Sequence, residues 1–110
     1  MVQFPFGEAD TQTLSATGDQ DLTITNWFTY IDGVTTEATG NRTINVTVGD
    51  QIKVGARIVI ANKTNGTETM TYGTSITGVV QTGAAGKTHV TEFVYTGSAF
   101  VQTGADQQID

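Results

Sequence analysis

The segment at residues 43–48 reads Thr-Ile-Asn-Val-Thr-Val and alternates strictly between polar and apolar side chains. Successive side chains of a β-strand point to opposite faces of a sheet, so this period of two predicts a strand with one buried side and one side facing solvent. Residues 51–61 alternate in the same way after the step Gly49-Asp50. We therefore expect the two segments to pair as a hairpin in a β-rich fold.

The second of these segments is apolar on both sides at one point. Five of its side chains share the side predicted to face the core: Ile52, Val54, Ala56, Ile58 and Ile60. Val59 stands on the opposite side of the same strand. Because both sides carry apolar residues there, this strand is expected to be covered on both faces near its end.

Turn signals divide the rest of the chain into short strand-like stretches. Three dipeptides stand between such stretches: Asp32-Gly33, Asn65-Gly66 and Gly97-Ser98. Residues of these types favour tight turns because they tolerate positive φ or bond their own backbone. Threonine, which is β-branched and suits a pleated surface, supplies 22 of the 110 residues. We expect an all-β fold, an antiparallel β-sandwich of jelly-roll type with about eight strands.

The length fits one domain, and its two ends differ from the middle. Residues 11–104 carry the strand and turn patterns and form the predicted β-sandwich domain. Residues 1–10 form a predicted N-terminal arm that contains Phe4 and Phe6, and residues 105–110 form a predicted polar C-terminal tail. An arm with two phenylalanines is useful either as a lid over its own core or as an anchor on a neighbouring molecule.

Composition argues against several classes of protein. With no cysteine, the chain has neither a disulfide framework nor a thiolate metal site. Its net charge is -6 with only five lysines and arginines, which disfavours nucleic acid because phosphate contacts need clustered positive charge. The chain shows neither a signal-peptide pattern nor an apolar run of the about 18 residues that suggest a membrane helix. We expect a soluble product that is not exported and that binds neither nucleic acid nor membranes.

Few residues are suited to catalysis or metal binding. His89 is the single histidine, and Glu92, three residues away on a predicted strand, falls on the opposite face. Residues 83–88 end like a phosphate-binding loop, but Gln81 stands where that motif requires glycine, and residues 88–95 read as a strand instead of a helix. We predict no catalytic centre, no metal site and no cofactor.

The aromatic residues near residue 30 are candidates for partner binding. Trp27 and Phe28 are adjacent, so on a strand their side chains point to opposite faces. One of them is therefore expected in the core and the other at the surface or in an interface. We assign Trp27, with Phe4 and Phe6, to the predicted partner-binding residues.

The segment at residues 92–101 reads Glu-Phe-Val-Tyr-Thr-Gly-Ser-Ala-Phe-Val, with an aromatic strand, a glycine turn and a second aromatic strand. It resembles the closing hairpin of many phage structural β-domains. In length, acidity and richness in threonine and glycine, the chain is similar to the small head decoration proteins of tailed bacteriophages, also called cement or stapling proteins. The resemblance rests on these general features and this one segment.

The resemblance implies a non-enzymatic virion protein on the outer surface of an icosahedral capsid. Such a protein stabilises the capsid by bridging neighbouring shell subunits, with the major capsid protein as partner and itself as a homodimer or homotrimer. One alternative is a carbohydrate- or receptor-binding β-module of a phage fibre or tail, for which Trp27 and the tyrosines are candidate residues. Another is a domain stabilised by calcium, which rests on Asp19 and Asp21 alone.

Overall fold

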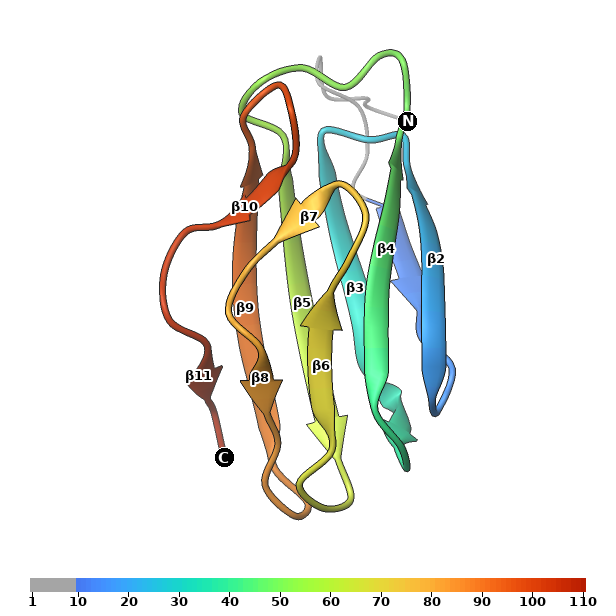
Figure 1. Cartoon of the computed structure of the whole chain (residues 1–110), viewed down its shortest axis with the longest axis vertical. Coiled ribbons are helices and arrows are strands. Elements are labelled where there is room, and N and C mark those ends of the chain that lie inside the picture. The colour runs from blue at the N-terminus through green and yellow to red at the C-terminus, as the bar shows by residue number, and fades with distance from the viewer. Residues whose placement is uncertain (1–9) are drawn as a thin grey trace, which may run out of the picture.

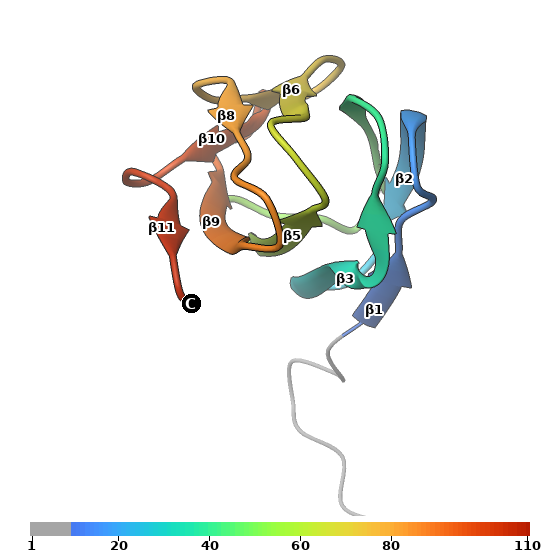
Figure 2. The same ribbon diagram turned by 90° about the horizontal axis from the view of Figure 1, so that it is seen from below.

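The computed structural model describes residues 10–110, so Phe4, Phe6 and the rest of residues 1–9 lie outside the described residues. Two β-sheets face each other across one interior (Figures 1 and 2). Sheet A has the order β1 (Asp10–Thr13), β3 (Phe28–Ala38), β5 (Arg57–Thr64), β9 (Thr88–Tyr95), β10 (Phe100–Gln102) and β7 (Ile76–Thr77), with β11 (Gln107–Gln108) also paired to β9. Sheet B has the order β2 (Gly18–Ile24), β4 (Arg42–Val48), β6 (Thr69–Tyr72) and β8 (Gln81–Thr82).

The chain changes sheet at every step from β1 to β9, as the two views show (Figures 1 and 2). Most lateral neighbours up to β8 are therefore two strands apart in sequence, and the pairs β1 with β3, β3 with β5, β2 with β4 and β4 with β6 are parallel. Antiparallel pairing joins β5 with β9, β9 with β10 and β6 with β8. Parallel neighbours need no long crossover connection here, because each link passes from one sheet to the facing sheet and the next link passes back.

The predicted all-β class is confirmed, and its details need correction. The sheets are mixed, so the prediction of an antiparallel sandwich is wrong. The described residues contain eleven strands where about eight were expected, and their order does not clearly follow a jelly roll. Residues 10–110 contain no helix, and hence none that is long and apolar enough to cross a membrane.

Four connections between neighbouring strands were predicted, and within residues 10–110 the one at Gly97-Ser98 alone joins two strands that pair with each other. Residues 43–48 and 57–61 lie in β4 and β5, which belong to different sheets, and Asn65-Gly66 likewise links β5 to β6 across the interior. Gly97-Ser98 does join a pair of neighbours, since Tyr95 of β9 lies opposite Phe100 of β10. Alternation identifies the buried side of a strand. It does not tell whether two such strands pair within one sheet or face each other from different sheets.

Asp32-Gly33 does not separate two strands, because β3 continues through it. The pairing of β3 with β5 shifts register between Gly33 and Ala38. Within this bulge, the Asp32 carboxylate accepts hydrogen bonds from the backbone N–H groups of Val34 (2.8 Å) and Thr35 (3.0 Å). The turn-forming residues are therefore used for a local distortion of one strand.

Apolar side chains from both sheets fill most of the interior. The core cluster consists of Leu14, Leu22, Ile24, Ile31, Ile44, Val46, Ile52, Ala56, Ile58, Ile60, Met70, Ile76, Phe93 and Phe100. Tyr72 meets Phe93 edge to face, with ring centroids 4.9 Å apart, and Tyr95 packs against Phe100 at 5.0 Å. Burial raises the pKa of Tyr72 to about 12, so this hydroxyl stays protonated at neutral pH.

A ladder of buried polar side chains crosses the rest of the interior. Arg42 donates a hydrogen bond to the Asn62 side-chain oxygen (2.6 Å), Asn62 donates to Gln81 (2.8 Å), and Gln81 donates to Thr91 (3.2 Å). All four residues are buried, and they alternate between sheet B and sheet A. Each bond of the ladder therefore ties one sheet to the other.

Arg42 is 1% exposed and is held mainly by backbone oxygens. Its guanidinium donates to the carbonyls of Ser15, Gly33 and Thr36, in addition to Asn62. Gly33 lies so close that a Cβ there would be 2.9 Å from Arg42 Nη1. The bulge in β3 thus turns carbonyl groups toward a buried charge, which is costly to bury without such partners.

Candidate binding surfaces

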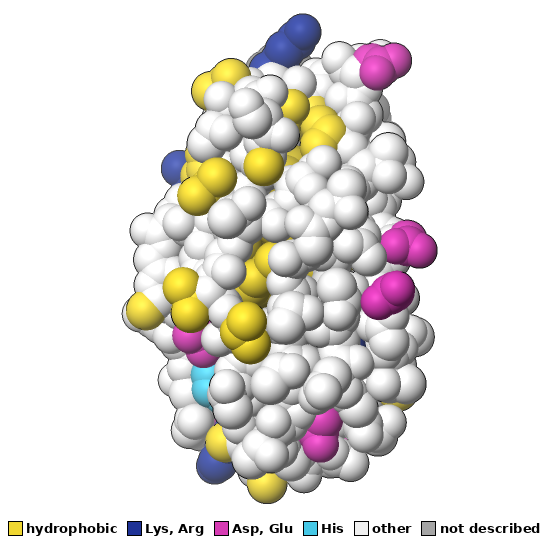
Figure 3. All heavy atoms as spheres, viewed as in Figure 1, with side chains coloured by type: hydrophobic (Ala, Val, Ile, Leu, Met, Phe, Trp, Pro, Cys, Tyr) yellow, Lys and Arg dark blue, Asp and Glu magenta, His cyan; other side chains and the backbone are white. Residues whose placement is uncertain are grey.

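The outer face of sheet B is uniformly polar. Its outward side chains are Asp19, Asp21, Thr23, Thr43, Asn45, Thr47, Thr69, Thr71 and Thr82. Neighbouring strands bond to each other along it: the hydroxyls of Thr43 and Thr71 are 2.9 Å apart, and Asn45 donates to Asp21 at 3.3 Å. Figure 3 shows few hydrophobic side chains over β2 and β4. This face therefore has little apolar area to offer a partner.

The outer face of sheet A has a different composition. We use this term for the outward side chains of β3 up to its bulge, β5, β9 and β10. Its apolar members are Phe28, Tyr30, Val59, Ala61, Val90, Val94 and Val101. None of the seven belongs to the core cluster. The strand containing Val59 was expected to be covered on both faces, but Val59 is only half-buried, so its outer side is not covered by a further layer of residues 10–110.

Register places these side chains in continuous rows. Phe28, Arg57, Val94 and Val101 lie opposite one another across four strands. Since residues directly opposite in adjacent strands point to the same face, their side chains form one surface. Tyrosine and arginine, which this face carries at Tyr30 and Arg57, are enriched among the residues that contribute most to protein contacts.

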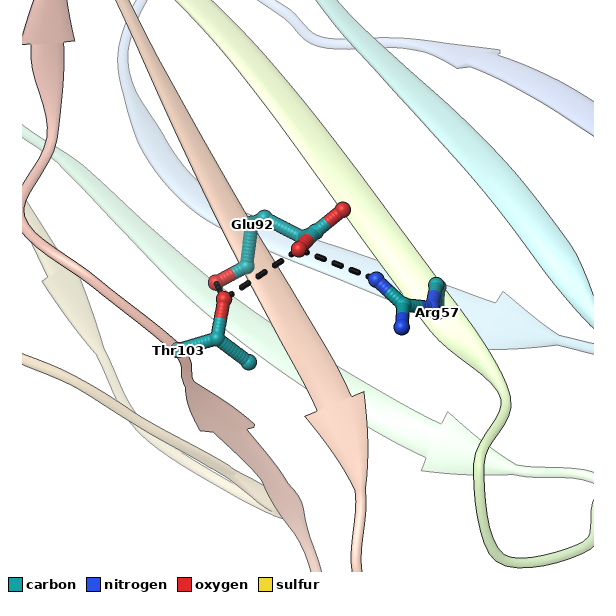
Figure 4. A network of polar contacts seen from close by, with 3 residues as sticks. All are labelled: Arg57, Glu92 and Thr103. Atoms are coloured by element: carbon teal, nitrogen blue, oxygen red, sulfur yellow. Dashed lines mark hydrogen bonds and ion pairs between the residues drawn. The ribbon is translucent and has the colours of Figure 1, made fainter.

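One ion pair lies in the middle of the outer face of sheet A (Figure 4). Arg57 Nη1 on β5 is 3.1 Å from Glu92 Oε1 on β9, and the two side chains are 48% and 42% exposed. The Thr103 hydroxyl lies 3.3 Å from the same carboxylate oxygen. Exposed pairs of this kind contribute at most about 1 kcal/mol to folding, so both charges are available to a partner.

A shallow apolar hollow of about 630 Å³ adjoins this face at its edge. It lies between the segment that follows β7 and the segment that includes β10 and continues beyond it, with Val79 and Val101 among its lining residues. Val79 is 75% exposed. Figure 3 shows hydrophobic side chains gathered on the side of the molecule where β10 and β7 lie. The apolar surface thus continues around the edge of sheet A.

A second hollow, of about 480 Å³, lies at the end of the sandwich that carries Trp27. The link from β2 to β3 supplies Thr25, Asn26 and Trp27, and residues 51–56 of the link from β4 to β5 supply the rest. Trp27 is 42% exposed. The expectation that one of Trp27 and Phe28 lies in the core is wrong, because Phe28 is half-buried on the outer face of sheet A and neither residue belongs to the core cluster.

Asp10, the first described residue, lies at this same end of the molecule. Asp10 lies opposite Thr29, two residues after Trp27 in the sequence. The other two predicted partner-binding residues, Phe4 and Phe6, belong to that stretch and lie outside the described residues. The segment predicted as a C-terminal tail contains β11, and Asp110 accepts a hydrogen bond from the backbone N–H of Thr88 (2.8 Å).

The segment that ends like a phosphate-binding loop connects β8 to β9. Its backbone N–H groups are engaged within the fold: Gly83 donates to Glu68, Gly86 to Thr64 and Lys87 to Ala84. An anion-binding loop needs such groups free and convergent. This segment is therefore a tight connection between two strands.

The remaining polar candidates do not converge. His89 is buried on the inner side of sheet A and Glu92 is exposed on its outer face, as predicted from their spacing. Asp19 and Asp21 lie on strand β2 and not in a turn. Within residues 10–110 there is no group of three His, Cys, Asp or Glu residues that is suited to hold a metal ion.

Comparisons with protein-family models, with curated proteins and with solved structures found no match. The fold and its surfaces define a small two-sheet β domain with one polar outer face, one apolar outer face and an exposed tryptophan at one end.

Proposed function

We propose that this chain is a non-enzymatic structural protein of a phage virion. It decorates the outer surface of an icosahedral capsid and stabilises the shell by bridging neighbouring subunits of the major capsid protein. The observation that supports this proposal best is the Trp27 end, where an exposed indole borders a hollow next to the point at which the arm with Phe4 and Phe6 joins the domain.

The chemistry of this end suits docking on a protein surface. Trp27 offers a large rigid contact area, and tryptophan is among the residues that dominate binding energies. Val54, which also lines this hollow, is 71% exposed. Burying Phe4 and Phe6 against a shell subunit adds about 1.5–3 kcal/mol each.

Repetition on a capsid makes such modest contacts sufficient. A shell presents many identical sites at fixed spacing, and a decorator that engages two of them at once gains affinity through its high effective local concentration. A polar outer face such as that of sheet B suits the side left in contact with solvent.

A carbohydrate- or receptor-binding module of a phage fibre or tail is the second candidate. It is favoured by the position of Trp27 beside polar side chains of the same hollow, including Asn26 and Gln51. An exposed indole flanked by amides fits the stacking and hydrogen bonding that a sugar ring requires.

Titration of undecorated shells with the full-length chain tests the proposal. We expect saturable binding that Trp27→Ala weakens at least about tenfold, because a central aromatic contact is lost. Val80→Ala is the matched control, since Val80 is exposed at 52% on the segment between β7 and β8, and this variant is expected to bind like the original chain. The absence of saturable binding overturns the proposal, and a glycan array that binds the chain but not Trp27→Ala supports the second candidate.

A further inference from the structure

We propose that the outer face of sheet A is a contact surface for a second copy of this chain, which packs against it face to face as a symmetric dimer. The inference is independent of whether the chain docks on a capsid. It rests on the apolar character of this face, on its charge balance and on the position of the pair formed by Arg57 and Glu92.

Six of the seven apolar side chains of this face are exposed or half-buried, and Ala61 is buried between its neighbours without belonging to the core cluster. Phe28 and Tyr30 are followed across the sheet by Val59, Val94 and Val101. Two sheets that pack face to face interdigitate side chains of this kind at a separation of about 10 Å. The outer face of sheet A thus carries apolar side chains suited to such a contact together with a few charged ones.

Charge indicates which partner this patch accepts. The molecule carries a net charge of -6, so two copies repel each other over most of their surfaces. The outer face of sheet A is balanced, with Arg57 and Lys63 against Asp32 and Glu92. The outward strand positions of sheet B carry acidic residues and no basic ones. Electrostatic repulsion between two copies is therefore smaller when they meet through the outer faces of sheet A than through those of sheet B.

The central ion pair is suited to a twofold contact. In a symmetric dimer, if residue i of one copy touches residue j of the other, then j also touches i. Arg57 and Glu92 lie on the two adjacent central strands, 3.1 Å apart. When two such faces meet, Arg57 of each copy approaches Glu92 of the other, and one intramolecular pair per chain becomes a group of four alternating charges.

The face is also large enough. The molecule measures 40 × 33 × 23 Å, and sheet A extends across one of its broad sides. A stable protein contact buries about 800 Å² on each partner, which is a fraction of such a side. A twofold axis parallel to the strands places both Trp27 ends on the same side of the dimer, so the dimer presents two docking ends in one direction.

The first experiment measures the mass of the full-length chain by sedimentation equilibrium over a wide range of concentrations. We expect a reversible dimer. Val59→Glu is expected to raise its dissociation constant at least about 30-fold, because this substitution places a charge within an apolar contact. Thr47→Glu is the matched control: Thr47 is exposed on the outer face of sheet B, and this variant is expected to dimerise like the original chain. A chain that is monomeric at all concentrations overturns the proposal, as does a dimer that Val59→Glu leaves unchanged.

A charge exchange provides a second test that does not depend on loss of folding. Arg57→Glu places two acidic groups side by side and is expected to weaken the dimer. Adding Glu92→Arg to that variant restores opposite charges both within each chain and across the twofold contact, so dimerisation is expected to return. Thermal melting of each variant at a concentration where it is monomeric separates folding from association. Failure of the double variant to recover while its melting is normal contradicts the contact.

Discussion

The outer faces of the two sheets enclose one interior but differ in composition. The outward side chains of sheet B are threonine, asparagine and aspartate. Those of sheet A include Phe28, Tyr30 and Val59, which lie near an ion pair. Both sheets need apolar residues inward, so the inward pattern does not distinguish them. The outward positions alone distinguish the two sheets, and the proposed contact of sheet A rests on them.

The largest expected effect tests whether the buried polar ladder holds the two sheets together. Arg42→Ala removes the first member of the polar ladder and leaves Asn62 and three carbonyl groups without their partner. We expect the free energy of unfolding to fall by about 3–5 kcal/mol, because breaking a buried charged network leaves desolvated polar groups. Denaturant unfolding measures this change.

Arg57→Ala is the control for the ladder because it removes an arginine from the outer face. Loss of its exposed ion pair is expected to cost at most about 1 kcal/mol. Equal effects of the two substitutions contradict the assigned role of Arg42.

The next prediction separates the Trp27 end from the outer face of sheet A. Trp27→Ala is expected to weaken shell binding and leave the dimer intact, whereas Tyr30→Ala is expected to weaken the dimer and leave the Trp27 hollow intact. Each aromatic contact is expected to be worth about 2 kcal/mol or more to its own partner. Parallel shell-binding and sedimentation measurements on both variants check this. If one variant loses both interactions, the two surfaces are not separate.

A smaller effect concerns the bulge that separates the apolar part of sheet A from its polar end. A Cβ at Gly33 would lie 2.7 Å from the carbonyl oxygen of Ala61, so Gly33→Ala is expected to lower the free energy of unfolding by about 1–3 kcal/mol. Gly104→Ala is the control, since a Cβ there meets nothing within 4 Å. Thermal melting distinguishes the two, and a Gly33→Ala variant as stable as Gly104→Ala refutes the close approach.

The smallest effect is a pH dependence at the edge of the same face. The hydrogen bond from the Thr35 hydroxyl, with the backbone N–H groups of Thr35 and Val34, lowers the pKa of Asp32. A lowered pKa in the folded state gives a stability contribution that is present above the unfolded value near pH 4 and is lost as the pH falls through the folded pKa. Asp32→Asn is therefore expected to flatten the acid side of the stability profile. A profile of unchanged slope shows that the carboxylate has no such role.

Strand alternation predicted the interior well and the topology poorly. Ile44, Val46, Ile58 and Ile60 are buried as their period of two requires. Val54 was expected inward and is 71% exposed, because it lies in the link between β4 and β5. Which strands lie side by side depends on whether each link crosses the interior, and local turn residues do not encode that choice.

The site was predictable where the signal is local. The apolar outward position of Val59 follows from strand alternation, whereas alternation alone did not decide which of Trp27 and Phe28 is exposed. The bulge at Asp32-Gly33 was not predictable as such, since its carbonyls serve Arg42, which comes from a strand of the other sheet. The charge balance of the outer face of sheet A also depends on long-range register, which brings Arg57 and Glu92 together from strands far apart in sequence.

Methyl-resolved nuclear magnetic resonance tests the central claim most directly, because each outer face carries its own methyl-bearing residues. Sheet A displays valines at Val59, Val94 and Val101, and sheet B displays threonines such as Thr43 and Thr47. On raising the concentration of the chain, the valine methyl signals are expected to shift or broaden while the threonine signals stay constant. Changes confined to the threonines, or no change on either face, would contradict the assignment of sheet A as the contact surface.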